Sequence, residues 1–428
     1  MSGEAGGYGG ESLAFLESVG ARVGDRLEGG GLSGRIMPRY EGGEDGIVVL
    51  KLASGYNVAV RVGRLAGSRV AEAPAGVTAA AAPARPAQAQ NLPSILLLST
   101  GGTIASRIDY VTGAVTPALD AAGLAESVPE LAGIARIEPR VAMSEHSENI
   151  EPAHWELIAT AVRDGSAGHG GVIVAHGTDT MQHTASYLAF ALAGLPVPIV
   201  LVGAQRSSDR PSSDAAENLI AAARLIASSP GPGVLVAMHE GPSDGRVSCH
   251  RATRVRKRHT SARGAFETVG GPPAFTVTRE GIEGPVGRQA SAPGPREPRI
   301  GVDARAALLK YHPGMDASAI DALVARGCRA LVLEGTGLGH VGRALYGPIS
   351  RAIGAGTLVM MCSQCGDGEV NMNVYESGRE LQKLGVVPLR DMLSETALVK
   401  AMWALSQEGT REGVERLMLE NVASEMSP

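Results

Sequence analysis

The feature that most constrains this chain is a series of short, almost wholly apolar runs separated by longer amphipathic segments. The runs occupy residues 94–98, 171–177, 198–203, 233–239, 330–335 and 357–362. Segments with helical periodicity lie between them, at Ala153–Arg163, Thr180–Ala193, Ser213–Ala227, Ala317–Ala325 and Tyr346–Ile353. Continuous apolar strands that alternate with helices are typical of parallel sheets covered on both faces. The pattern therefore predicts an α/β fold built on parallel sheets.

Changes in composition divide the chain into three units and two linkers. Residues 1–72 contain short β-rich runs and the turn signals EGGEDG and SGYN, which predict a small barrel-like β domain or a curled sheet. Residues 73–92 form an Ala/Pro-rich linker. A larger α/β unit is expected over 93–286 and a smaller one over 300–428, joined by a second linker at 287–299.

Composition excludes several classes of protein. Hydrophobic residues make up 44% of the 428 residues and charged residues 19%, which is typical of globular proteins and not of disordered ones. The formal net charge of −5 gives no general reason to expect a nucleic-acid binder. We find no basic, apolar leader and no apolar run of about 18 residues, so we expect a cytoplasmic protein without a membrane segment.

The cysteines do not indicate a disulfide framework or a metal site. The chain has 4 cysteines, too few for a disulfide scaffold of this length. Cys362 and Cys365 have C-x-x-C spacing, but there is no second pair. We therefore interpret them as ordinary thiols rather than zinc ligands or a redox pair, and we predict no metal site.

Two threonine-rich clusters directly follow predicted strands. STGGT, at residues 99–103, follows the first strand of the α/β body, and AHGTDT, at 175–180, follows the next. The glycines allow a sharp turn and a close backbone approach, and the cluster at 99–103 is neither a phosphate loop nor a G-x-G-x-x-G motif. Such turns could be structural, and a Thr or Asp in 178–180 could cap the following helix. Alternatively, the two clusters present hydroxyl groups to a substrate at one edge of the sheet.

Two further polar segments have open interpretations. Residues 246–266 are rich in basic side chains, with Arg251, Arg254, Arg256, Lys257, Arg258, His259 and Arg263. This run could be a solvated loop or a phosphate-binding patch, or it could bring one lysine into a site as the base that a threonine nucleophile needs. The segment 147–149, Ser-Glu-Asn, could cap a helix or hold the charged groups of an amino acid.

The clusters together resemble the bacterial-type L-asparaginase family. TGGTI at residues 100–104, HGTDT at 176–180 and a lysine before RHTSARGAF follow one another in the family's order, and the resemblance spans about 94–405. The stretches SENIEPAHW, VRKRHTS and KYHPGMD, together with the β-rich N-terminal domain, resemble the GatD branch of the family. GatD proteins are the glutaminase subunits of archaeal glutamyl-tRNA(Gln) amidotransferases. The resemblance implies an asparaginase-like two-domain body preceded by a small β-barrel.

The resemblance also assigns catalytic roles. Thr103 is similar to the nucleophilic threonine of the family, which attacks the side-chain amide of the substrate. Thr178, Asp179 and Lys257 match the second catalytic set, in which the lysine acts as a base through the threonine.

The same resemblance implies residues that bind the substrate. Ser147 and Glu148 match the grip on the charged groups of the amino acid, a function that Asp179 shares for the α-amino group. We place the oxyanion hole at backbone N–H groups near Gly102 and Thr178. Tyr110 matches a helper tyrosine on a loop that is shorter here than in free asparaginases.

Partners and cofactors follow from the same resemblance. No cofactor is expected in this chain, whereas ATP and Mg²⁺ belong to a GatE partner that binds Glu-tRNA(Gln) and receives the ammonia. A homodimer within a heterotetramer is implied. We keep two other interpretations open: a free-standing cytosolic L-asparaginase or glutaminase, and a non-catalytic module that binds RNA through the basic run.

Overall fold

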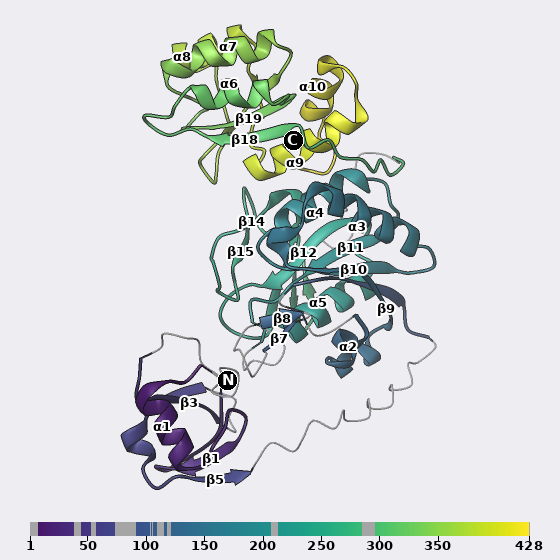
Figure 1. The fold of residues 1–428 in the computed structure, drawn as a ribbon. Helices are drawn as coiled ribbons and strands as arrows, with labels where there is room; N and C mark the ends of the chain where they lie inside the picture. Colours follow the sequence, from purple (N-terminus) through teal and green to yellow (C-terminus); the bar gives the residue numbers. More distant parts are fainter. Residues whose placement is uncertain are drawn as a thin grey trace.

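Three sheets of at least four strands organise the part of the chain that the structure describes (Figure 1). This computed structural model describes residues 7–37, 44–52, 57–72, 91–102, 104, 106–108, 115–117, 121–206, 213–284 and 296–427. The sequence-based domain boundaries remain predictions, and most of the two proposed linkers lies outside the described residues.

The N-terminal unit is a five-stranded antiparallel sheet with strand order β4-β3-β2-β1-β5. Its strands are β1 (Arg26–Gly29), β2 (Leu32–Ile36), β3 (Ile47–Leu52), β4 (Asn57–Arg61) and β5 (Arg69–Glu72). Helix α1 (Gly10–Ser18) and the 3-10 turn η1 (Val62–Leu65) complete a small core around Leu27 and Leu50, both 0% exposed. The β-rich unit predicted from the sequence is confirmed, and α1 adds a helix that was not predicted.

The larger α/β unit contains an eight-stranded sheet with order β17-β16-β13-β12-β11-β10-β6-β9. Its parallel strands are β6 (Ser94–Gly101), β9 (Arg136–Glu145), β10 (Gly171–Ala175), β11 (Pro198–Val202) and β12 (Gly233–His239). The strands β13 (Arg246–Arg251), β16 (Phe275–Thr278) and β17 (Ile282–Glu283) run antiparallel to their neighbours. The parallel sheet expected from the sequence is confirmed for the first five strands, and this edge adds antiparallel strands that were not predicted. The reason is the short connection between β12 and β13, because a parallel neighbour needs a long crossover.

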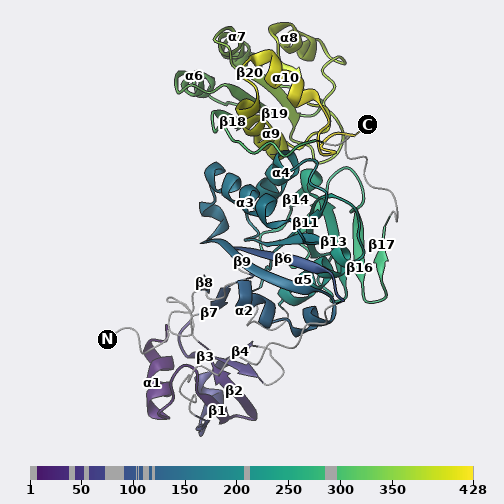
Figure 2. The ribbon, with the colours of Figure 1, turned by 90° about the vertical axis from the view of Figure 1, so that its right-hand side faces the viewer.

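Helices cover both faces of this sheet (Figure 2). One face packs on α3 (Pro152–Gly165) and α4 (Met181–Ala191), and the other on α2 (Ala121–Glu126) and α5 (Ala215–Ala227). Successive side chains of β6 lie on opposite faces of the sheet: Leu96 is in the core with α3 and α4, and Leu97 is in the core with α5. A strand that is buried on both faces is therefore apolar throughout, as the sequence indicated.

The smaller α/β unit is a parallel sheet of order β18-β19-β20-β21. Its strands are β18 (Ala306–Lys310), β19 (Ala330–Gly335), β20 (Leu358–Ser363) and β21 (Val387–Pro388). Its helices are α6 (Ser318–Ala325), α7 (Tyr346–Gly354), α8 (Glu376–Leu384), α9 (Ser394–Gln407) and α10 (Arg411–Leu419). The rings of Phe190 on α4 and Trp403 on α9 stack with centroids 5.8 Å apart, so one apolar core joins the two α/β units.

Short elements complete the described chain. The two-stranded sheets pair β7 (Ser106–Ile108) with β8 (Val115–Pro117) and β14 (Val255–Lys257) with β15 (Phe266–Thr268). The 3-10 turns are η3 (Pro129–Gly133), η4 (Ser147–Asn149), η5 (Ala252–Arg254) and η6 (Arg343–Leu345). None of the helices in the described part of the chain has the length and apolar character needed to cross a membrane.

Candidate active site

Three neighbouring strand ends pack closely together at one edge of the large sheet. Gly102, just after β6, has a φ of +81°, and a Cβ atom on it would lie 2.4 Å from Cα of Gly177, which follows β10. A Cβ on Gly177 would in turn lie 2.7 Å from Cβ of Ser147, which follows β9. Glycine is required at both positions because any side chain would push the segments apart. The carboxyl ends of β6, β9 and β10 thereby converge.

The two threonines of the first cluster are separated by this turn. Thr100 is fully buried, and its hydroxyl donates a hydrogen bond to the carbonyl of Ala175 at 3.0 Å, so it ties β6 to β10. Thr103 and Tyr110 lie outside the residues that the structure describes. Their roles remain predictions.

Lys257 lies against the second cluster. Its Nζ donates to Thr178 Oγ1 at 2.9 Å and to Asp179 Oδ1 at 2.6 Å. The Lys257 side chain is 11% exposed and that of Asp179 is 66% exposed, so the amine is shielded from solvent whereas the carboxylate is accessible to it. The backbone N–H of Lys257 donates to Gln182 Oε1 at 2.7 Å, which fixes the end of β14 against α4. The structure thus brings Thr178, Asp179 and Lys257 together, although they come from distant parts of the chain.

Ser147 is held by the same cluster rather than by a helix. The backbone N–H of Asp179 donates to Ser147 Oγ at 3.3 Å, and the hydroxyl of Thr180 donates to the Ser147 carbonyl at 2.6 Å. Glu151 is the N-cap residue of α3, so the alternative in which Ser147 caps a helix is wrong. Thr180 does occupy the N-cap position of α4, but its hydroxyl bonds to Ser147 and not to the helix. Glu148 is exposed beside Ser147.

His176 lies at the centre of this packing and is fully buried. Its Nδ1 is 2.6 Å from the carbonyl of Gly177. Burial lowers the pKa of His176 to about 4, because an imidazolium would lose its hydration there. The ring is therefore neutral near pH 7, and it stabilises the turn that carries Thr178.

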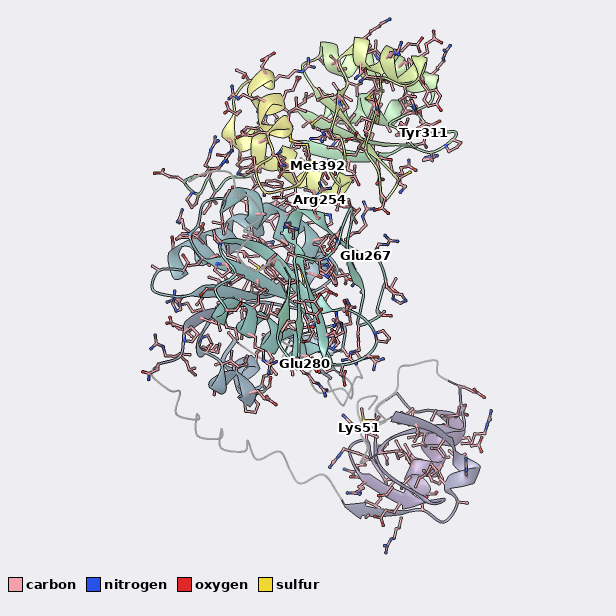
Figure 3. The ribbon with its side chains drawn as sticks, turned by 180° about the vertical axis from the view of Figure 1, so that it is seen from behind. Lys51, Arg254, Glu267, Glu280, Tyr311 and Met392 are labelled. Atoms are coloured by element: carbon pink, nitrogen blue, oxygen red, sulfur yellow. The ribbon has the colours of Figure 1, made fainter. Side chains whose placement is uncertain are left out.

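The basic run around Lys257 does not form an unpaired patch. Four of its guanidinium groups have carboxylate partners, two of which belong to the smaller unit. The pairs are Arg254–Asp391, Arg256–Glu395, Arg258–Glu267 and Arg263–Asp244. Figure 3 shows Arg254 at the boundary between the two α/β units. Because the charges are balanced locally, the phosphate-patch interpretation loses its main support, and so does the RNA-binding module.

Sequence reasoning did not identify the residues that support Lys257. Gln182 accepts its backbone N–H, and Glu395 on α9 holds Arg256, one residue before it, at 2.7 Å. Gln182 lies only four residues after Thr178 and could have been suspected as a neighbour. Glu395 lies 139 residues from Arg256, and no local pattern connects them.

One other group of side chains could hold a cation by its chemistry. Ligand atoms of Glu217, His239 and Asp244 lie within 4.8 Å of one another. The guanidinium of Arg263 contacts both His239 and Asp244, so this group already contains a positive charge. We assign no metal to it.

Comparisons with known proteins agree with this architecture. Residues 94–286 match the N-terminal asparaginase family model, residues 305–418 match the glutaminase/asparaginase C-terminal domain, and residues 19–66 match the GatD N-terminal domain. The L-asparaginase structure from Thermococcus kodakarensis superposes with a TM-score of 0.70 at 31% identity, covering 78% of this chain and 99% of that one. For L-asparaginase I from Vibrio cholerae the TM-score is 0.68 at 26% identity, with coverages of 79% and 100%.

Curated relatives cover nearly the whole chain. The D subunit of the glutamyl-tRNA(Gln) amidotransferase from Pyrococcus furiosus is 43% identical over 97% of this chain and 97% of its own length. The corresponding protein of Methanopyrus kandleri, which has the same name, is 44% identical over 98% of this chain and 94% of its own length. The resemblance seen in the sequence is confirmed over the N-terminal sheet as well as both α/β units. This chain belongs to the asparaginase-like family of glutamyl-tRNA(Gln) amidotransferase D subunits.

Proposed function

We propose that this chain is the glutaminase subunit of a glutamyl-tRNA(Gln) amidotransferase. The observation that carries the proposal is the position of Lys257, whose Nζ reaches Thr178 Oγ1 at the sheet edge where Gly102 follows β6 and packs on Gly177. A threonine hydroxyl is a weak nucleophile without a neighbouring base, and an amine held beside a second hydroxyl can supply one. The matching N-terminal domain favours the amidotransferase subunit over a free asparaginase.

The proposed reaction proceeds in two steps. Thr103 Oγ attacks the side-chain amide carbon of glutamine, and its proton passes by way of Thr178 and Lys257 to the leaving amide nitrogen, which departs as ammonia. Water then attacks the resulting ester, releases glutamate and returns a proton to Thr103. In this second step Lys257 again accepts a proton, now from the attacking water, and passes it on to the Thr103 oxygen.

Neighbouring residues would bind the substrate. The exposed carboxylate of Asp179 suits the α-amino group of glutamine, and we assign the other charged end of the substrate to Ser147, which contacts Asp179, and to Glu148, the residue after it. We assign the oxyanion that forms in each step to backbone N–H groups near Gly102 and Thr178, on the two segments that meet where Gly102 packs on Gly177. Tyr110 is proposed as a helper that activates Thr103.

As a subunit, the chain requires partners. We propose that a GatE subunit receives the ammonia, binds Glu-tRNA(Gln), and uses ATP and Mg²⁺ to activate the glutamate, while this chain needs no cofactor. The proposed assembly is a homodimer of this chain within a heterotetramer, located in the cytoplasm. The L-asparaginases of similar fold keep a second candidate open, in which the same chemistry releases ammonia without a partner.

The decisive experiment compares Thr103→Ala with Thr103→Ser in the complex with GatE. We expect the alanine variant to lose glutamine-dependent ammonia release by on the order of 10²-fold or more, because the attacking atom is gone, while serine retains part of the rate. With added ammonium, the alanine complex should still convert Glu-tRNA(Gln). An alanine variant that hydrolyses glutamine at the normal rate would show that Thr103 is not the nucleophile. Rapid asparagine hydrolysis by this chain alone would favour the free asparaginase.

A further inference from the structure

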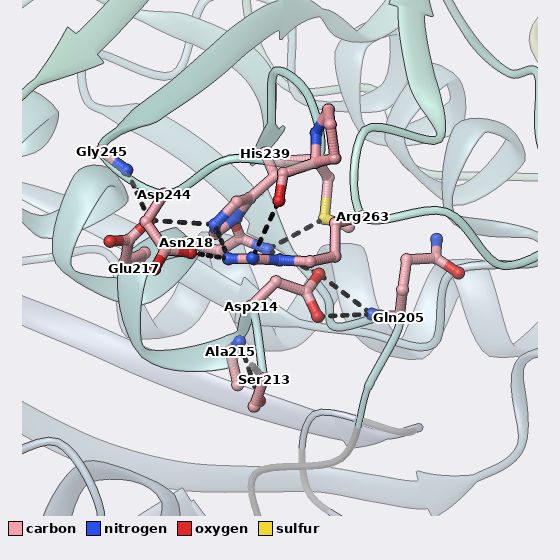
Figure 4. A network of polar contacts seen from close by, with 12 residues as sticks. Gln205, Ser213, Asp214, Ala215, Glu217, Asn218, His239, Asp244, Gly245 and Arg263 are labelled. Carbon is pink, nitrogen blue, oxygen red and sulfur yellow. Dashed lines mark hydrogen bonds and ion pairs between the residues drawn. The ribbon is translucent and has the colours of Figure 1, made fainter. Parts of the chain in front are cut away.

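A polar network lies beside the proposed site, where β11 and β12 end (Figure 4). Its centre is Arg263, on the connection between β14 and β15, whose side chain is 10% exposed. Arg263 Nη2 donates to His239 Nε2 at 2.5 Å and to the carboxylate of Asp244, and Nη1 donates to the carbonyl of Pro242 at 3.1 Å. One arginine therefore ties the β14–β15 connection to the last residue of β12 and to the turn that follows it.

The hydrogen-bond pattern determines the tautomer of His239. Asn218 Nδ2 donates to the carbonyl of Gly203 at 3.0 Å and to Asp214 at 3.3 Å, so its Oδ1 accepts from His239 Nδ1 at 2.8 Å. Nδ1 therefore carries the proton, and the lone pair of Nε2 accepts from Arg263. His239 is fully buried, and its pKa is lowered by burial and by Arg263.

Charges face His239 from each of the surrounding elements. Asp214 and Glu217 come from the start of α5, Asp244 from the β12–β13 turn and Arg263 from the β14–β15 connection. Glu217 Oε2 is 2.9 Å from His239 Nε2 and accepts the N–H of Gly245 at 3.0 Å. A protonated His239 would donate to Glu217 and repel Arg263, so the contact with Arg263 requires the neutral ring.

The network reaches the segments on both sides of the Lys257–Thr178 contact. On one side, the connection that follows Lys257 is held close: a Cβ on Gly264 would lie 2.7 Å from Cα of Gly241. On the other side, Asn218 bonds to Gly203, where a Cβ would lie 2.7 Å from Thr178 Cγ2. The distance between the amine and the hydroxyl thus depends on two segments that the same network joins.

We propose that Arg263 is a positioning residue for Lys257: by bridging His239 and Asp244 it fixes the β14–β15 connection so that the amine stays within reach of Thr178. This inference rests on the proposed function, because it assigns Lys257 a role in the reaction. It differs from the proposed function in that Arg263 touches neither the substrate nor the reacting atoms.

The test compares Arg263→Met with Arg246→Met in the full complex. Arg246 is a matched control: it starts β13 at the other end of the same turn, but it is 47% exposed and pairs with Glu240 and Glu283. We expect Arg263→Met to lower kcat for ammonia release by on the order of 10²-fold with a smaller change in KM, and to speed amide hydrogen exchange in residues 258–265. Arg263→Lys should restore only part of the rate, because an ammonium lacks the planar fork. Arg246→Met should change neither quantity.

His239 supplies a second readout. His239→Gln keeps an acceptor near the position of Nε2 but does not titrate, so the acid side of its pH–rate profile should move to lower pH, whereas His239→Leu should lose rate at every pH. Unchanged kcat and unchanged exchange in Arg263→Met would overturn the inference. That result is distinct from failure of the proposed function, in which the unmodified complex itself would release no ammonia from glutamine. The exchange measurement needs no activity and tests the positioning directly.

Discussion

Lys257 and Lys400 both pair with a carboxylate, but their surroundings are opposite. Lys400 on α9 and its partner Glu425 are both 0% exposed. The Lys400 ammonium donates to Glu425 Oε1 at 2.5 Å and to the carbonyls of Met418 and Glu420, so its three N–H groups are all used. Lys257 donates to two side chains, and its partner Asp179 is open to solvent.

The difference separates a structural amine from one that can react. Glu425 also accepts the backbone N–H groups of Val422 and Ala423, so the Lys400 pair anchors the last residues of the chain. Any loss of a proton there would leave a buried carboxylate uncompensated. Lys257 instead lies against the Thr178 hydroxyl, from which it accepts a proton in the proposed reaction, and the Asp179 carboxylate is open to an incoming substrate. The two lysines differ in how many of their N–H groups are hydrogen-bonded and in the burial of their carboxylate partners, not in residue type.

The largest effect is expected from Lys257→Met. Removing the amine should lower glutamine-dependent ammonia release by on the order of 10²- to 10⁴-fold, since the proposed general base is lost. The free energy of unfolding should change by only about 1 kcal/mol, because the partner carboxylate is solvated. Ammonia release and urea denaturation measure the two quantities. If Lys257→Met kept its activity, Lys257 would not be the reactive amine, and its proposed difference from Lys400 would be wrong.

Lys400→Met should show the reverse pattern. It leaves Glu425 buried and unpaired, which we expect to cost about 3–5 kcal/mol of unfolding free energy. Arg351→Met is a suitable control, because Arg351 is 62% exposed and its partner Asp321 is 44% exposed, an arrangement worth at most about 1 kcal/mol. Urea denaturation of both variants checks this. Equal losses of unfolding free energy in the two variants would mean that burial of an ion pair does not determine how much it stabilises the fold.

Acid should weaken the part of the molecule that contains Lys257. Burial lowers the pKa values of His176 and His250 to about 4, whereas an unfolded histidine titrates near 6.5. Between these values the unfolded chain binds more protons, so stability is complete above about pH 6.5 and falls as the pH drops toward 4. Each ring should cost about 2 kcal/mol at pH 5 relative to pH 7.

Denaturation at pH 7 and pH 5 measures this dependence. His250→Asn is the informative variant, because an amide group can both donate and accept and so can replace Nδ1, which is 2.8 Å from Thr268 Oγ1, without titrating. The variant should lose less stability than the unmodified chain over this pH interval. An identical pH dependence would exclude His250 as a contributor.

The smallest difference between a variant and its control is expected for backbone packing at the site. Gly102 and Gly168 both have a φ of +81°, but a Cβ on Gly168 would have no neighbour within 4 Å. Gly168→Ala should cost about 1 kcal/mol through backbone strain alone. Gly102→Ala should cost about 1–2 kcal/mol more and lower the activity, because the methyl group would displace Gly177. Similar denaturation midpoints for the two variants would mean that the segments can separate without cost.

Part of the site could be predicted because its residues follow strands. STGGT and AHGTDT each follow an apolar run, and parallel neighbours bring their carboxyl ends to one edge, where Gly102 and Gly177 meet. The antiparallel strands β13 and β16 were missed, because their short, mixed sequences carry little periodic signal. Helix α8 was missed for a similar reason, since ESGRELQKL has only two large apolar residues.

By itself, the sequence determined the β-rich N-terminal unit, the α/β body, the family and the cluster of Thr178, Asp179 and Lys257 as candidates. These depend on local periodicity and on short motifs, which a single chain displays directly. Only the tertiary structure decided that the arginines around Lys257 are paired, that Ser147 holds the Asp179 backbone and that Arg263 bridges His239 and Asp244. The partner carboxylates of Arg254 and Arg256 lie 137 and 139 residues away, and folding alone brings such charges within hydrogen-bonding distance.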